Sequence, residues 1–177
     1  RNRRQRWEFY RIRAEGHNLP VINPDEGPDQ VLDAFVPIHF TSAPERVTAA
    51  LDLTPAYAGR ADRVQRTLSM VNRSYVVVRD EIQAQTPVEV WWFLHTEAEV
   101  ELAADGRTAL LRQNGKQLSV HLDSPHGARF ALMPARPLPT SPDPEVQGSS
   151  EGRRKLAVHL PEVTDLRLAV RLVPDWK

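Results

Sequence analysis

The residues best suited to chemistry lie near the start of the chain, where cationic, imidazole and amide side chains follow one another closely. Arg11, Arg13, His17 and Asn18 precede a loop rich in Pro and Gly, and Gln30 follows that loop. Guanidinium groups bind anions, and a positioned imidazole can transfer a proton. The cluster predicts a site for an anionic ligand. The alternative for His17 and Asn18 is a structural role in a turn, where Asn bonds nearby backbone readily.

Positive charge is concentrated at the start of a chain that is otherwise balanced. The 177 residues carry 23 Lys and Arg against 23 Asp and Glu, whereas residues 1–16 hold six Arg against Glu8 and Glu15. A nucleic-acid-binding domain is expected to be basic overall, but an acidic sugar in one cleft needs only a local patch. We therefore expect an acidic polysaccharide as the partner and no nucleic acid, although the first arginines also suit a solvated terminal segment or the end of a linker.

Two further classes are excluded by composition. No stretch reaches the roughly 18 consecutive apolar residues of a membrane-spanning helix, so no contact with a membrane is expected. The chain contains no Cys, which excludes disulfides and thiolate chemistry. Phosphate-binding glycine loops, nucleophile elbows and paired carboxylates with glycosidase spacing are also absent from the sequence.

Strand signals dominate the chain. Residues 97–102 alternate polar with apolar side chains, and Asn114-Gly115 suits a two-residue hairpin turn. Residues 43–51 are the only segment that suits a short turn of helix. The pattern predicts an all-β fold, a two-layer antiparallel β-sandwich. The expected strands cover residues 74–79, 88–96, 97–102, 107–113, 117–122, 156–160 and 166–173.

The chain is predicted to form a single domain over residues 1–177. Residues 134–155 interrupt the strand pattern with five Pro and a Gly-Ser-Ser run. Such a segment can neither donate fully to a strand ladder nor bury much apolar surface, so we predict a mobile surface loop. The 22 residues after it are too few for a core of their own and are expected to rejoin the same sandwich.

Several motifs follow one another over about residues 7 to 125. The first are Phe9-Tyr10-Arg11-Ile12-Arg13, His17-Asn18 and Gln30. Next come Asp52-Leu-Thr-Pro-Ala-Tyr57, Arg66 before Tyr75 to Asp80, and Trp91 to Thr96. In this order they resemble the C-terminal β-sandwich region of heparinase II/III-like polysaccharide lyases.

The resemblance implies β-elimination in a uronic-acid-containing polysaccharide of the heparin, heparan or alginate kind, in a periplasmic or secreted enzyme. It implies that His17 is catalytic, and that Arg11, Arg13, Asn18 and Gln30 bind substrate. In the family the remaining catalytic residues, a tyrosine among them, lie on an upstream helical toroid. We expect that domain to be missing from this chain, which alone would be inactive. Leu19 stands where the family usually has Thr.

Some relatives in this family hold a structural zinc, for which Asp52 and His95 are the nearest candidates here. Zinc requires about four ligands, and the sequence has no matching histidine cluster, since Leu19 and Val88 stand where histidines would be expected. We predict no metal and no cofactor. Asp52 is expected to cap the turn into Thr54, and His95 to be a satisfied core or interface histidine.

Two rival functions remain open from the sequence. The chain could be a non-catalytic carbohydrate-binding module whose arginines hold an acidic glycan. It could also be a structural β-domain that uses the Trp91 to Phe93 strand as an interface, since Trp91 and Trp92 must point to opposite faces. An upstream helical domain with a Tyr facing the cleft would favour the enzyme.

Overall fold

A computed structural model of the protein describes residues 5–175, which form one antiparallel sheet with three short 3₁₀ helices. Arg1, Arg3 and Arg4 of the N-terminal arginine run lie outside the described residues. The strands are β1 (Pro20–Ile22), β2 (Ile38–Ala43), β3 (Arg46–Asp52), β4 (Arg63–Val71), β5 (Tyr75–Thr96), β6 (Glu99–Leu102), β7 (Thr108–Gln113), β8 (Lys116–Ser124), β9 (Ala131–Pro134) and β10 (Arg154–Pro174). The helices are η1 (Gln5–Glu8), η2 (Ala14–Gly16) and η3 (Thr54–Tyr57).

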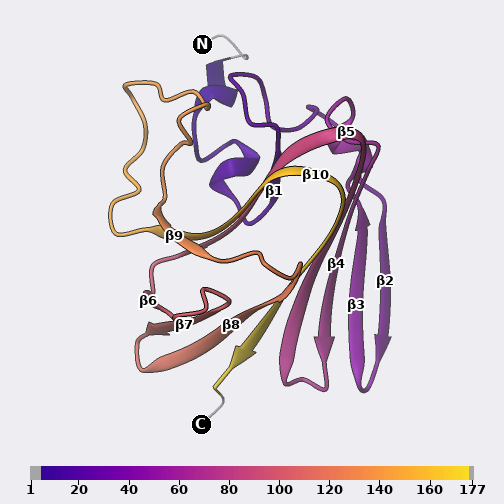
Figure 1. The fold of residues 1–177 in the computed structure, drawn as a ribbon, viewed down its shortest axis with the longest axis vertical. Helices are drawn as coiled ribbons and strands as arrows, with labels where there is room; N and C mark the ends of the chain where they lie inside the picture. Colours follow the sequence, from indigo (N-terminus) through magenta and orange to yellow (C-terminus); the bar gives the residue numbers. More distant parts are fainter. Residues whose placement is uncertain (1–4, 176–177) are drawn as a thin grey trace.

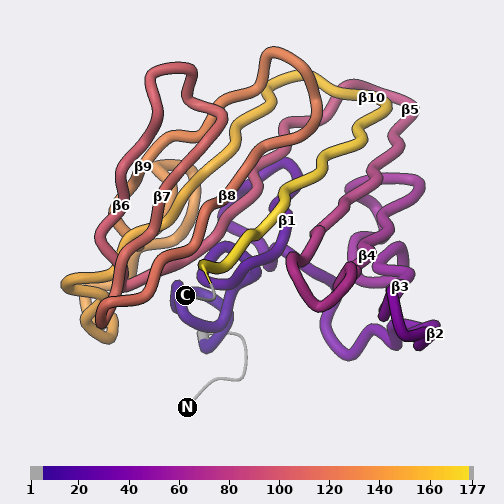
Figure 2. Tube along the Cα trace, turned by 90° about the horizontal axis from the view of Figure 1, so that it is seen from below, coloured from indigo at the N-terminus to yellow at the C-terminus, as the bar shows by residue number. Residues whose placement is uncertain are grey.

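The strands lie in the order β2-β3-β4-β5-β10-β8-β7-β6, while β1 pairs with β5 and β9 pairs with β10 (Figures 1 and 2). Every pairing is antiparallel. The prediction of an all-β fold is confirmed. In the described part of the chain no helix is long and apolar enough to cross a membrane.

The two layers of the sandwich arise because β5 and β10 bend back on themselves. The Trp92 indole nitrogen and the Asp80 carboxylate lie 3.0 Å apart on the same strand. Twelve residues of extended strand would separate them by about 40 Å, so β5 must turn between them. The partner strand β10 shifts register between Leu160 and Asp165, where Figure 1 shows it curving over.

The first layer consists of β2, β3, β4, β6, β7 and β8, together with the first half of β5 and the second half of β10. The other half of each bent strand forms the second layer together with β1 and β9. These halves are residues 88–96 of β5 and 154–160 of β10. The face of the first layer that turns toward the second layer is its inner face.

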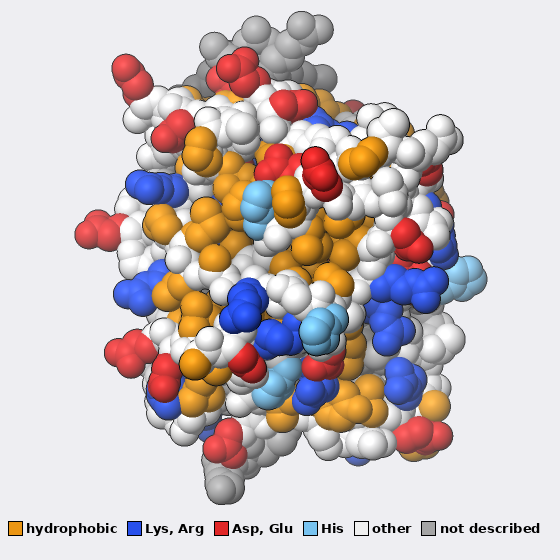
Figure 3. Space-filling view, viewed as in Figure 1, with side chains coloured by type: hydrophobic (Ala, Val, Ile, Leu, Met, Phe, Trp, Pro, Cys, Tyr) orange, Lys and Arg blue, Asp and Glu red, His pale blue; other side chains and the backbone are white. Residues whose placement is uncertain are grey.

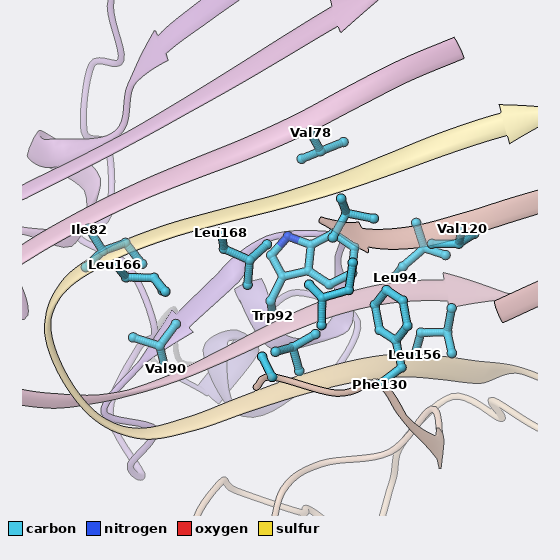
Figure 4. Packing of buried hydrophobic residues seen from close by; sticks show 14 of the residues in the cluster. Val78, Ile82, Val90, Trp92, Leu94, Val120, Phe130, Leu156, Leu166 and Leu168 are labelled. Carbon is cyan, nitrogen blue, oxygen red and sulfur yellow. The ribbon is translucent and has the colours of Figure 1, made fainter. Parts of the chain in front are cut away.

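The main core lies between these layers. Trp92 is 2% exposed and its ring lies among aliphatic side chains of both layers (Figure 4). Trp92 and Phe93 are both buried, whereas Trp91 is half-buried and stacks on His159 with ring centroids 3.9 Å apart. The prediction that Trp91 and Trp92 face opposite ways is confirmed. Because Trp92 and Phe93 are inside, this strand offers no broad aromatic interface.

Part of the inner face of the first layer extends beyond the second layer and stays uncovered. Phe40 is 65% exposed and Ile38 63% exposed on β2. Leu68 and Met70 on β4 are exposed as well, and the register puts Phe40, Leu68 and the core residue Val78 in one row. Elsewhere charges of both signs surround the hydrophobic areas, as the face in Figure 3 shows.

The structure confirms the predicted hairpin turn and contradicts the predicted turn of helix. Asn114 and Gly115 have φ values of 50° and 72° at the tip of the β7–β8 hairpin, which confirms the predicted turn. Residues 43–51 do not form a helical turn, because β3 pairs along its whole length with both β2 and β4. These cross-strand contacts outweigh the local preference of its alanines.

Residues 135–153, within the Pro-rich segment, contain no strand or helix. They pack on the N-terminal segment, since the Tyr10 amide donates to Gln147 Oε1 over 2.9 Å and the Arg11 guanidinium leaves no room for a Cβ at Gly148. The mobility of this loop stays a prediction.

Candidate functional site

The segment that precedes His17 is fixed to the second layer by a buried ion pair. Glu15 on η2 and Lys155 on β10 are each 0% exposed, and their charged atoms lie 3.2 Å apart. Lys155 Nζ also donates to the Arg136 carbonyl over 2.9 Å and lies 4.2 Å from the centre of the Phe93 ring. The Leu138 amide donates to the same Glu15 oxygen. The pair therefore joins η2, β10 and the Pro-rich loop.

Arg13 is part of the same buried framework. Its side chain pairs with Asp29 at 2.5 Å, and its remaining terminal donors reach the carbonyls of Gly27 and Asp25 at 2.8 and 3.0 Å. Asp29 in turn accepts the Glu15 amide over 3.0 Å. Arg13 is 2% exposed, which argues against direct contact with a ligand. The structure gives it the role of holding the loop beside the site.

His17 and Asn18 form an exposed turn between η2 and β1. Arg66 on β4 holds this turn, because its Nη1 donates to the Asn18 carbonyl. Two bonds of 2.7 Å join Arg66 to Asp80, which also accepts the Trp92 indole N–H at 3.0 Å. A chain of buried groups thus connects the core to the Asn18 backbone.

The Asn18 side chain is held by His95 at the end of β5. Asn18 Oδ1 lies 2.8 Å from the His95 amide nitrogen and 3.1 Å from His95 Nδ1. Because a carbonyl oxygen only accepts, this arrangement puts the ring proton on Nδ1. His95 Nε2 is then the acceptor for the Tyr10 hydroxyl at 2.7 Å. The His17 side chain is exposed and makes no hydrogen bond within residues 5–175.

This environment favours a neutral His95. Burial, helped by the positive charge of Lys155 and by His17, lowers the pKa of His95 to about 4. Burial likewise raises the pKa of the Tyr10 hydroxyl above its ordinary value. His95 and Tyr10 therefore act as a neutral hydrogen-bonded pair that fixes Asn18 next to His17.

We expect His95 to stay neutral in the folded chain until the pH falls to about 4. Its folded pKa lies below the unfolded value of about 6.5, so its contribution to stability is complete above that pH and is lost as the pH falls toward 4. Histidine ring NMR signals recorded against pH measure this directly. Urea unfolding should show a weaker pH dependence over this range for His95→Gln than for the native chain. Titration of His95 near pH 6.5 would contradict the neutral pair.

The other predicted binding residues lie apart from the His17–Asn18 turn. Arg11 is exposed and lies against Gly148 of the Pro-rich loop. Gln30 is half-buried and lines a hollow of about 280 Å³ together with Arg13 and Asp29. The structure therefore brings His17 and Asn18 together with His95, Tyr10 and Arg66, which the sequence did not single out as site residues.

Asp52 caps the turn into η3 as predicted, because the Thr54 amide donates to its side chain over 3.1 Å. Over residues 5–175, no group of three or more His, Asp or Glu side chains is arranged to hold a metal ion. That the chain binds no zinc stays a prediction, which elemental analysis of the purified chain would test.

Comparison of the whole fold with solved structures finds a heparan sulfate lyase and heparinase III chains. A heparan sulfate lyase from Pedobacter heparinus matches with a TM-score of 0.69 and 8% identity over 92% of this chain and 24% of its own. A heparinase III with methylated lysines matches with a TM-score of 0.69 and 12% identity, over 95% of this chain and 25% of its own. Another heparinase III gives a TM-score of 0.64 and 12% identity.

The chain thus shares its fold with about a quarter of the length of these lyases. No family model matches the sequence, and no curated protein matches it significantly. At such identities the likeness concerns the fold alone.

Proposed function

We propose that this chain is the β-sandwich part of a polysaccharide lyase that cleaves a uronic-acid-containing polysaccharide, of the heparin, heparan or alginate kind, by β-elimination. The observation that carries the proposal is the exposed imidazole of His17, which makes no hydrogen bond within residues 5–175, on a turn that Arg66 and His95 hold from two sides. The common fold with heparin and heparan sulfate lyases supports the same class of reaction.

Beta-elimination removes the proton beside the uronate carboxylate and expels the sugar oxygen on the neighbouring carbon. His17 serves as the acid or base, since no group within residues 5–175 is bonded to its ring nitrogens. Asn18 uses its Oδ1 for His95, so its Nδ2 is the group left to donate to a ligand oxygen. Arg13 acts only through the loop it holds, and Arg11 and Gln30, which lie apart from the turn, are assigned no contact with the reacting sugar.

The reaction also needs groups that face His17 from the other side of the ligand. The uncovered apolar strip with Ile38, Phe40, Leu68 and Met70 lies on the same face as Arg66, whose guanidinium contacts Asn18. A helical domain that buries this strip would stand opposite the His17–Asn18 turn. We propose that the missing partner is such a domain, in keeping with the quarter of the matched lyases that this chain spans.

The test compares the 177-residue chain with the same chain joined to the helical domain of its full-length gene. We expect no activity from the chain alone. In the joined enzyme, His17→Ala should lower turnover by roughly a hundredfold or more, the scale for losing a positioned acid or base. Ultraviolet absorbance of the unsaturated uronate, with heparan, alginate and hyaluronan as substrates, reports the reaction.

His126→Ala is the matched control, because His126 is another exposed loop histidine. It should leave turnover unchanged, and both variants should unfold at the temperature of the native enzyme. Near-native turnover in His17→Ala would mean that His17 takes no part in the reaction and is only a structural loop residue. Lyase activity in the chain alone would put the active site elsewhere.

A further inference from the structure

A second feature lies on the outer face of the first layer, away from the His17–Asn18 turn. Along β4 and β5 the residues Thr67 and Arg79 alternate with Arg66 and Asp80, so the two sets point to opposite faces of the sheet. The outer face of β4, β5 and β10 contains a groove of about 690 Å³. Groups that line it cannot share a ligand contact with Arg66 or Asn18 through the sheet.

The groove exists because small side chains occupy the middle of this face. Thr67, Arg79 and Ala169 are register partners across three strands, and Ser69 pairs with Val77 in the next row. Ser69 is 6% and Ala169 8% exposed, although both point away from the core. Longer side chains around them form the walls, among them the half-buried ring of Tyr75.

Arginine dominates the charge of the groove. Arg46, Arg79, Arg167 and Arg171 line it against Glu81 and Asp123, four positive charges against two negative, which leaves an excess of two. Arg171 is bonded to Asp123 by two contacts of 3.0 Å, and Glu81 lies 3.7 Å from Arg63.

The remaining arginines Arg46, Arg79 and Arg167 have no ion-pair partner among residues 5–175. Arg79 and Arg167 lie diagonally across β5 and β10, because Arg167 pairs with Glu81 and Arg79 with Ala169. Glu81, opposite Arg167, offsets only one of these positive charges, so a bound anion would lower the remaining repulsion between the arginines. The groove is therefore poised for a ligand that carries negative charge.

We propose that this groove is a second binding site for an acidic polysaccharide chain, separate from the site of cleavage. The mixed lining suits sugars, because the guanidinium groups of Arg46, Arg79 and Arg167 bind carboxylate or sulfate, while the hydroxyl of Thr67 and the nearby carboxylates bond sugar hydroxyls. Tyr75 offers a ring face for stacking. The choice of ligand rests on the proposed function, but the site does not need His17.

The test is calorimetric titration of a heparin octasaccharide into the 177-residue chain at low and moderate salt. The double variant Arg79→Ala/Arg167→Ala should bind roughly tenfold more weakly or worse, the scale expected for losing bonds to charged groups. The matched control Arg112→Ala/Arg153→Ala removes the same charge from arginines that pair on the surface with Glu101 and Glu97. It should bind like the native chain.

Other outcomes overturn the proposal. Equal weakening of octasaccharide binding in both double arginine variants would mean that the sugar is attracted by positive charge in general and not by the groove. Unchanged binding in Arg79→Ala/Arg167→Ala, with loss in His17→Ala/Asn18→Ala, would confine the sugar to the cleavage site and leave the lyase proposal standing. Equal competition by a single-stranded oligonucleotide of the same charge would show a general polyanion surface. Conversely, groove binding in the absence of lyase activity from the joined enzyme would refute the proposed function alone.

Discussion

Glu15→Ala is expected to lower the free energy of unfolding by about 3–5 kcal/mol, because removing one member of a buried ion pair leaves the other charge uncompensated. Lys155 is 0% exposed, and its ammonium would keep only the Arg136 carbonyl and the rings of Phe93 and Tyr10. Burial already lowers the pKa of Lys155, and Glu15 opposes that effect. Urea unfolding at neutral pH measures the loss.

The control is Glu97→Ala, which removes a carboxylate that pairs with Arg153 at a similar distance of 2.9 Å, where both side chains are about half exposed. Exposed pairs of this kind contribute about 0–1 kcal/mol. The variant Glu15→Leu/Lys155→Met should recover much of the stability lost in Glu15→Ala, since an apolar pair leaves no buried charge. A loss below about 1 kcal/mol in Glu15→Ala would mean that water or a loop movement screens Lys155.

Much of the sheet could be predicted from the sequence, because its signals are local. The Asn114-Gly115 turn and the alternation over residues 97–102 depend only on neighbouring residues. The bend was not predictable, since β5 appeared as two separate strands around the polar residues 83–87. What joins its halves is the common partner β10, and nothing in the local pattern reveals that pairing.

The candidate site was predictable by residue type but not by partner. His17 and Asn18 were predicted to be site residues, which stays a prediction, and His95 was predicted to be a satisfied histidine. No local signal indicates that Asn18 is the residue that satisfies His95, because 77 residues separate them. Arg13 appeared available for a ligand, but its charge is used by Asp29 within the loop that follows. The 140-residue separation of Glu15 and Lys155 hides their pairing in the same way.

Asp80→Ala is expected to lower the free energy of unfolding by about 3–5 kcal/mol as well. It removes the acceptor of both the buried Arg66 guanidinium and the Trp92 indole N–H. Urea unfolding should show this loss. Asp123→Ala is the control, since its two bonds to Arg171 lie where both side chains are more than a third exposed. It should cost about 0–1 kcal/mol.

Asp80→Ala should also reach the His17–Asn18 turn, which distinguishes it from a purely structural variant. Arg66 without Asp80 no longer presents a fixed donor to the Asn18 carbonyl, so the Asn18 amide and the His95 ring should shift in NMR spectra of the folded variant. Asp80→Asn keeps an acceptor for Trp92 and should fold with a smaller loss, which allows the spectra to be recorded even if the alanine variant unfolds. Unchanged Asn18 and His95 signals in both variants would show that β1 and His95 alone hold the turn, and that the Arg66–Asp80 pair serves the core.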